Sequence, residues 1–328
     1  MSALPSAVPA PDAAQSPMYN PTEGDAKRPD WSALLHEALT QPGLLSDAYR
    51  QFHRYSAGNA MLIALQAMVR GLPLGPVASF KAWLNKGYAV KKGEKALAMV
   101  MPVTVTSKAA DPEEDSAEGS SSSSEKAAAS KGGSKRTVFM FRRNWFLFSQ
   151  VEPGEGAQPL ETAQTPEWSL ERASETLGIA LLPFSMPDGN CQGFASKDGI
   201  AVNPLARFPV KTGAHELAHV LLGHVDGEAI IDHEALPRSK MEAEAESVAF
   251  IVAASLGQSE EALSSARAYI QGYLGVRGTT GSPEVEEFKK KSASRVFSVA
   301  DKILRAGQPP AAKEEGAPAD SDHPTAEA

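Results

Sequence analysis

The chain has 328 residues, 42% of them hydrophobic and 22% charged, and its formal net charge at pH 7 is −8. This length and apolar content are sufficient for one large or two medium-sized domains. The single cysteine, Cys191, excludes an internal disulfide framework and a cysteine-based zinc site. No apolar run approaches a membrane span, and the first residues lack the pattern of a signal peptide, so we expect a cytoplasmic protein without a membrane partner.

The net charge combines two segments of opposite sign. From Arg50 to Thr106 there are eight basic residues and one acid, Glu94, which gives a net charge of +7. From Lys211 to Glu260 there are three basic residues and nine acids, which gives −6. Such an asymmetry indicates separate domains with different partners.

Three stretches are predicted to be disordered. Residues 1–29 and 306–328 are rich in alanine, proline and polar residues, and residues 107–135 contain a run of serines flanked by charges. None of them carries enough apolar surface to offset the entropy lost on ordering. We therefore expect two disordered tails and one disordered insertion.

The first folded segment is predicted at residues 30–152. Its apolar pattern changes from helical spacing to the alternation of strands after Gly87. The predicted elements are helices at 31–41, 59–69 and 80–86, followed by strands at 88–90, 96–105 and 136–148. The last two strands are separated by the insertion, which is tolerated best at the tip of a hairpin, where added length costs little. The segment is therefore predicted to be a small α+β domain.

This segment also has the composition of a surface that binds single-stranded nucleic acid. Such surfaces combine a basic groove for the phosphates with aromatic rings on which bases stack. We predict Tyr55 as the stacking ring and assign Trp83 and Phe52 to the core. The predicted contacts to DNA are Arg54, Tyr55, Asn59, Lys86, Lys91, Lys92, Lys95, Arg142 and Arg143.

Several motifs in residues 31–152 resemble the N-terminal domain of ArdC-type antirestriction proteins. They are Tyr55-Ser56-x-x-Asn59, Trp83 with Gly87, the run VKKGEK at 90–95 before a strand and Pro102, and Phe146 with Gln150. The resemblance implies a domain that binds single-stranded DNA. The insertion at 107–135 departs from the family pattern.

A second folded segment, residues 168–305, follows a linker at 153–167. The predicted elements are a helix at 168–177, strands at 179–184 and 199–202 around a turn at 188–190, and helices at 212–223, 239–256 and 260–274. Strands followed by a histidine-bearing helix and a helix rich in glutamate are the order of a minimal zincin core. The fold class is therefore predicted as α+β, with two domains.

The helix at 212–223 contains the pattern His-Glu-x-x-His. A spacing of four residues puts His215 and His219 on one face, where both imidazoles can bind one Zn²⁺ ion. Glu216 beside them is predicted to act as a general base toward a water that attacks a carbonyl group. The alternative is an amphipathic helix with two ordinary histidines.

A third metal ligand is predicted on the following helix. His224 misses the register of a three-histidine pattern by one residue and is assigned to a supporting or surface position. Glu242 and Glu246 lie one helical turn apart, so Glu242 is assigned to the metal and Glu246 to orienting a histidine. The reverse assignment, Glu244 as the ligand, and a merely solvated acidic face stay open.

The runs HELAHVLLGH and EAEAESVAF resemble the zincin domain of ImmA/IrrE-type metallopeptidases and of the C-terminal half of ArdC-type proteins. The resemblance covers residues 168–275. It implies that His215, His219 and Glu242 hold the metal and that Glu216 is the catalytic carboxylate.

These observations predict a single-stranded DNA-binding antirestriction protein of a mobile element, with a C-terminal metallopeptidase-like domain. The alternative is a DNA-associated zinc metalloendopeptidase that cleaves a regulatory or host protein. A third interpretation is that the chain is the front part of a larger polyvalent protein.

Overall fold

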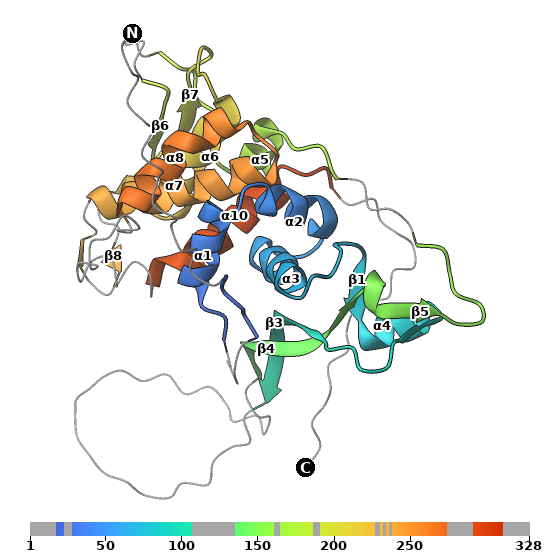
Figure 1. The fold of residues 1–328 in the computed structure, drawn as a ribbon. Coiled ribbons are helices and arrows are strands. Elements are labelled where there is room, and N and C mark those ends of the chain that lie inside the picture. The colour runs from blue at the N-terminus through green and yellow to red at the C-terminus, as the bar shows by residue number, and fades with distance from the viewer. Residues whose placement is uncertain are drawn as a thin grey trace, which may run out of the picture.

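The computed structural model is of mixed α and β type, as predicted, and describes residues 18–22, 28–106, 135–160, 165–185, 191–226, 230–231, 234–235, 238–273 and 291–310 (Figure 1). The predicted insertion and most of both predicted tails lie outside these residues. Within them, no helix combines the length and apolar character needed to cross a membrane.

Three helices begin the fold: α1 (Trp31–Thr40), α2 (Leu44–Phe52) and α3 (Ala57–Val69). The Asp30 side chain accepts hydrogen bonds from two backbone N–H groups in the first turn of α1. The Ser56 side chain accepts one from the backbone N–H of Asn59 at the start of α3. These caps satisfy donors that have no partner inside the helix. The helix α2 was not predicted, and it begins after Gly43, whose positive φ of 78° favours glycine.

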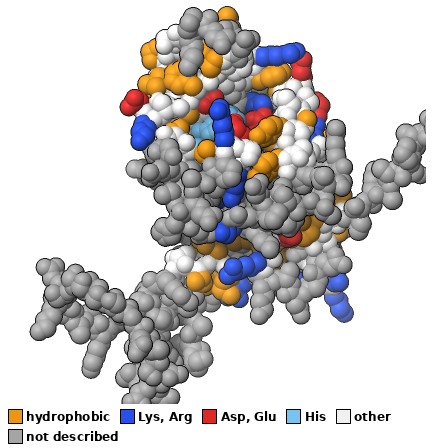
Figure 2. Space-filling model, turned by 90° about the vertical axis from the view of Figure 1, so that its left-hand side faces the viewer, with side chains coloured by type: hydrophobic (Ala, Val, Ile, Leu, Met, Phe, Trp, Pro, Cys, Tyr) orange, Lys and Arg blue, Asp and Glu red, His pale blue; other side chains and the backbone are white. Residues whose placement is uncertain are grey.

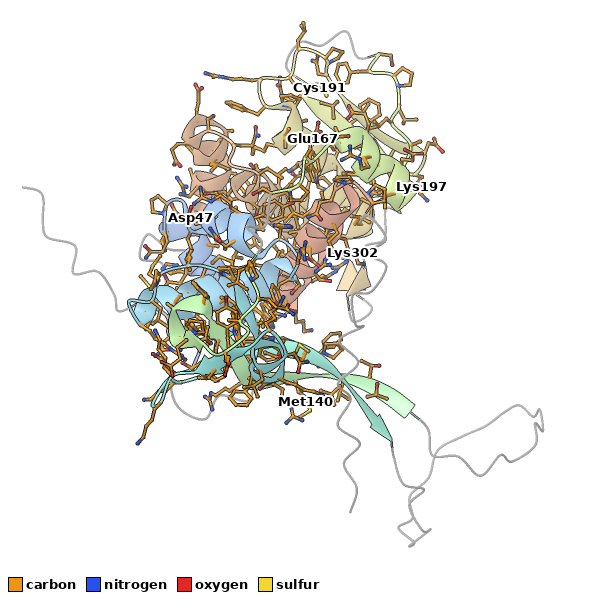
Figure 3. The ribbon with its side chains drawn as sticks, turned by 90° about the vertical axis from the view of Figure 1, so that its right-hand side faces the viewer. Asp47, Met140, Glu167, Cys191, Lys197 and Lys302 are labelled. Atoms are coloured by element: carbon orange, nitrogen blue, oxygen red, sulfur yellow. The ribbon has the colours of Figure 1, made fainter. Side chains whose placement is uncertain are left out.

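The main sheet has the order β1-β4-β3, with all neighbours antiparallel. Its strands are β1 (Val77–Ser79), β3 (Leu97–Thr106) and β4 (Lys135–Leu147). Thr106 pairs with Lys135, so the insertion joins two neighbouring strands, which confirms the predicted hairpin. Met140, labelled in Figure 3, lies on this sheet at the opposite end of the molecule from Cys191.

A smaller unit packs beside the sheet. It contains α4 (Phe80–Asn85), the 3-10 helix η1 (Phe148–Gln150) and the strands β2 (Tyr88–Val90) and β5 (Val151–Pro153), which pair antiparallel. Trp83 is almost fully buried, and its indole N–H donates to the carbonyl of Phe146. The assignment of Trp83 and Phe52 to the core is therefore confirmed.

Two buried amides of α3 cover the outer edge of β3. The Asn59 amide accepts a hydrogen bond from the Val100 N–H and donates one to the Val100 carbonyl, both at 2.9 Å. On the same face of α3, about two turns further along, Gln66 makes the same pair of bonds with Ala98, at 2.8 and 2.9 Å. Each side chain thus replaces a neighbouring strand and satisfies backbone groups that burial would otherwise leave unpaired.

The second half contains most of the remaining helices. Its elements are α5 (Leu170–Leu177), β6 (Gly193–Ser196), β7 (Gly199–Val202), α6 (Pro209–Leu221), η2 (His224–Asp226), β8 (Ile230–Ile231), β9 (Glu234–Ala235), α7 (Arg238–Ser255), α8 (Glu260–Tyr273) and α10 (Ala293–Ala306). The strand predicted at 179–184 is wrong, because that segment makes only a bridge between Leu181 and Ile200. The partner of β7 is β6, which was not predicted.

The two halves share one hydrophobic core. Buried side chains from α1, α2 and α3 are continuous with those of α6, α7 and α10. In Figure 1, α10 lies between the N-terminal helices and the rest of the second half. The ring of Trp31 on α1 lies 5.6 Å from that of Phe297 on α10, and Asp301 accepts a hydrogen bond from the N–H of Ala57. The predicted linker is therefore not the main connection between the halves.

The role of the buried amides can be tested with Gln66→Met, which keeps the volume of the side chain. We expect the free energy of unfolding to fall by about 2–4 kcal/mol, because the Ala98 backbone groups lose both partners. Denaturant titration followed by circular dichroism measures this loss. The control is Met68→Gln on the same helix, where the side chain is exposed and stability should stay unchanged. Equal stability of wild type and Gln66→Met would contradict the role.

Candidate metal centre and nucleic-acid surface

The helix α6 presents two histidines on one face. Pro209 occupies its first turn, and the buried Ala214, Leu217 and Ala218 fix its opposite face in the core. This packing leaves His215 and His219, one turn apart, on the partly exposed side. Their Nε2 atoms lie 3.1 Å apart.

A carboxylate from α7 completes a cluster of three possible ligands. Glu242 Oε2 lies 3.5 Å from His215 Nε2 and 3.7 Å from His219 Nε2. Two ligand atoms that bind one tetrahedral ion at about 2.05 Å lie roughly 3.3 Å apart. The three separations lie close to this value. The structure thus brings together the three predicted ligands in an arrangement that could hold a divalent metal ion.

The other ring nitrogen of His215 faces a second glutamate of α7. His215 Nδ1 lies 2.9 Å from Glu246 Oε2, and the other oxygen of Glu246 lies 2.6 Å from Lys211 Nζ in the first turn of α6. A carboxylate in this position fixes the ring orientation and directs Nε2 toward the cluster. This is the position predicted for Glu246.

His219 has a different neighbour. Its Nδ1 lies 3.1 Å from Nδ1 of His224, and Nε2 of His224 lies 3.0 Å from Glu244 Oε2. The side chains of His224 and Glu244 are 1% and 0% exposed. His224 therefore occupies a supporting position rather than the surface. Glu244 faces His224 and is not part of the cluster formed by His215, His219 and Glu242.

The cluster favours positive charge. Burial lowers the pKa of His215, but Glu242 and Glu246 outweigh this effect and raise the pKa to about 9. In turn, hydrogen bonding to His215 and His219 holds the pKa of Glu242 well below its ordinary value. The carboxylates thus stabilise a positive charge at the point where the three ligand atoms meet, whether this is a proton on His215 or a bound cation.

Glu216 lies at the same site, beneath strand β6. Its side chain is buried, and this burial raises the pKa of its carboxyl group, while His215 and His219 lower it. A Cβ atom placed on Gly193 would stand 3.0 Å from Glu216 Oε1 and 2.8 Å from Thr212 Cγ2. Glycine is therefore required for the close approach of β6 to the carboxylate. Sequence reasoning missed Gly193, because its role depends on the packing of β6 on α6.

The site is accessible from one face of the molecule. Figure 2 shows a histidine surface in the upper half, surrounded by acidic and basic side chains. The side chains of His215, His219 and Glu242 are 20%, 14% and 36% exposed. A small ligand or an extended chain can therefore reach the three ligand atoms.

Most of the predicted DNA contacts lie on the surface. The exposed residues are Arg54, Lys86, Lys91, Lys92, Lys95, Arg142 and Arg143. Lys91 Nζ also donates a hydrogen bond to the carbonyl of Ser149, which places this lysine beside η1.

Two of the predicted contacts, Asn59 and Tyr55, make hydrogen bonds within the fold. The Asn59 side chain is 9% exposed, and its amide is committed to β3. The Tyr55 ring packs against the core, and its hydroxyl donates to the carbonyl of Val77. The motif that contains both residues therefore supports the fold. Gln150 has a similar role, because it is buried and bonded to Glu94 and to backbone groups.

Aromatic rings other than that of Tyr55 are exposed on the surface. Phe80 at the start of α4 and Phe148 in η1 are 44% and 43% exposed, and Leu84, one turn after Phe80, is 50% exposed. The Phe148 ring lies 6.2 Å from Trp83 and 5.9 Å from Tyr88. Sequence reasoning missed Phe148 as an exposed ring, because a phenylalanine at the end of an apolar strand is normally buried.

Comparisons with known proteins found one family and one solved protein that are similar to this chain. Residues 26–145 match the family described as the N-terminal domain of anti-restriction factor ArdC. The antirestriction ArdC protein from the R388 plasmid is a similar solved structure in two forms. The metal-free form has a TM-score of 0.43 and 17% identity over 84% of this chain and 94% of that chain. The Mn(II)-bound form has a TM-score of 0.45 and 19% identity over 84% and 97%. No curated protein matches.

The close packing of β6 on the candidate centre can be tested with Gly193→Ala. We expect a loss of about 1–3 kcal/mol in the free energy of unfolding, because the new methyl group meets Glu216 Oε1, Thr212 Cγ2 and the Ala201 carbonyl. Thermal denaturation measures the change. The control is Gly272→Ala, where no heavy atom lies within 4 Å of the added Cβ. The packing argument fails if the two variants are equally stable.

Proposed function

We propose that the chain binds single-stranded DNA and protects it from restriction, on the premise that residues 26–145 match the family of ArdC N-terminal domains. The observation that carries the proposal is a set of exposed apolar side chains in the small unit of α4 and η1, which we call the aromatic face. This aromatic face consists of Phe80, Leu84 and Phe148. Lys86 and Lys91 are exposed in the same unit.

The aromatic face has the properties of a stacking platform. Its rings lie on a rigid base, since Phe80 lies 6.2 Å from the buried Phe146 and Phe148 contacts the buried Trp83 and Tyr88. A ring held in this way loses little conformational entropy when a base stacks on it. Stacking on an aromatic ring contributes about 1–3 kcal/mol per base and tolerates any sequence.

Basic side chains supply attraction for the phosphates. Lys91 is anchored near Phe148 by its bond to Ser149, and Lys92 and Lys95 follow on the adjoining turn. Arg142 and Arg143 extend the exposed positive charge along β4. The second half is acidic between Lys211 and Glu260, with a net charge of −6 from three basic and nine acidic residues. Electrostatics therefore favours binding on the sheet and α4 side of the molecule.

Binding without sequence preference fits an antirestriction role. A protein that coats the incoming strand of a mobile element must accept any sequence, which stacking and phosphate contacts allow. Base-specific hydrogen bonds would restrict it to few sites. The proposed biological function is therefore protection of single-stranded DNA during transfer.

The double variant Phe80→Ala/Phe148→Ala tests the aromatic face. We expect roughly a 10–100-fold weaker affinity for a labelled oligothymidylate, because one or two stacked bases lose their ring. Fluorescence anisotropy measures the affinity. The control is Tyr269→Ala, which removes a ring of similar exposure (43%) from α8 and should leave binding unchanged.

A second variant separates stacking from charge. Lys91→Ala/Lys92→Ala should reduce the salt dependence of binding by roughly 0.7 per lost phosphate contact in a plot of log K against log salt. The aromatic variant should keep the slope of the wild type. Wild-type affinity in both variants would refute binding at this face.

We propose as a second function a zinc-dependent peptidase, on the observation that Glu216 lies beside the cluster of His215, His219 and Glu242. When bound there, Zn²⁺ supplies a Lewis acid that polarises a carbonyl group and lowers the pKa of water. Glu216 accepts a proton from the attacking water and passes it to the leaving amine. The substrate class is a protein, such as a regulatory or host factor.

The variant Glu216→Gln tests this second function. We expect it to bind one zinc ion per chain, as the wild type does, because Glu216 is not one of the three ligands. It should lose cleavage of any coexpressed substrate by at least roughly 100-fold, since a neutral amide cannot accept the proton. Metal content by elemental analysis and product detection by mass spectrometry measure the two effects. Cleavage retained in Glu216→Gln would contradict the assigned role, and absence of metal from wild type and variant alike would refute the metal site.

A further inference from the structure

The surroundings of His219 include a buried charge network that the proposed reaction does not use. Glu244 is completely buried and ionisable, and such a group is costly unless it is paired. Its oxygen Oε2 lies 3.0 Å from His224 Nε2 and 3.8 Å from Arg295 NH1 on α10. Arg295 also donates a hydrogen bond to the carbonyl of Leu222 at the end of α6.

We propose that His224, held by Glu244 and Arg295, is a positioning residue for the metal ligand His219. This inference rests on the metal site proposed above. It assigns a function to His224, which lies outside the three-ligand cluster, and to Glu244, which the sequence alone leaves open as a metal ligand.

The proton positions follow from the distances. A histidine that binds a metal through Nε2 uses the lone pair of that atom, so neutral His219 carries its proton on Nδ1. This N–H points at His224 Nδ1, 3.1 Å away, which must therefore be the acceptor. His224 then carries its proton on Nε2 and donates it to the carboxylate of Glu244 at 3.0 Å. The N–H groups of His219 Nδ1 and His224 Nε2 thus each have an acceptor.

The two ligand histidines are thus supported in different ways. His215 Nδ1 faces the carboxylate of Glu246 directly, and His219 reaches a carboxylate only through His224. Groups that orient a metal-binding histidine typically change metal affinity by 10–100-fold when they are mutated. The indirect support also connects the ligand to α10 through Arg295, and α10 packs on the N-terminal helices.

The test compares three variants of the full chain by zinc titration against a competing chelator. In His224→Phe the ring volume is kept but the acceptor is lost, so zinc affinity should fall by roughly 10–100-fold. In His224→Asn, the amide oxygen takes the place of Nδ1 and can accept the His219 proton, so affinity should recover most of that loss. In Glu244→Gln the charge is removed from a side chain of the same shape, and affinity should fall by a smaller factor.

Controls separate positioning from folding. His53→Phe makes the same change at a histidine beside Tyr49, outside the metal site, and should leave zinc affinity unchanged. Circular dichroism of the metal-free variants verifies the fold. If His224→Phe does not fold, the zinc affinities of the other two variants decide the test: Glu244→Gln should bind zinc more weakly than the wild type, and His224→Asn should stay close to it. Wild-type affinity in His224→Phe, or equal losses in the phenylalanine and asparagine variants, would overturn the inference. Absence of zinc binding by the wild type would instead refute the metal site itself.

Discussion

The second half of the molecule depends on the pairing of histidines from α6 and η2 with glutamates from α7. Burial of charge between two packed helices is unfavourable unless each charge has a partner. Here Glu242 lies against the two ligand histidines, Glu246 against His215 and Lys211, and Glu244 against His224 and Arg295. The register of α6 on α7 is therefore set by electrostatic matching as well as by the apolar faces of both helices. The same matching collects the ligand atoms at one point.

This arrangement is not isolated from the N-terminal half of the molecule. A single core runs from α1 and α3 through α10 to α6 and α7. The helix α10 bears Phe297, which contacts Trp31, and Arg295, which contacts Glu244. Stability of the candidate metal centre and stability of the N-terminal helices are therefore linked, because neither side can be removed without exposing part of the common core. The N-terminal helices and the candidate metal centre thus share one hydrophobic core.

The N-terminal domain shows how a motif can serve the fold rather than the ligand. Asn59 and Gln66 both face β3 from α3, and their amides satisfy the edge of the strand. The side chain of Gln150 likewise accepts a hydrogen bond from the backbone N–H of Leu147, just before η1. These polar residues make their hydrogen bonds inside the domain. The exposed side chains include lysines, arginines and the rings of Phe80 and Phe148. That division is typical of proteins that bind single strands by charge and stacking.

The sequence alone was sufficient for features that depend on local spacing. The four-residue interval of His215 and His219, the apolar face of α1 and the continuous apolar run of α3 are local patterns. The hairpin of β3 and β4 follows from the low cost of a long loop between neighbouring strands. Tertiary structure decided what depends on packing between distant segments. It placed Gly193 against Glu216, buried Asn59, exposed Phe148, and turned His224 toward Glu244. These contacts join residues far apart in the chain, so no local pattern carries their signal.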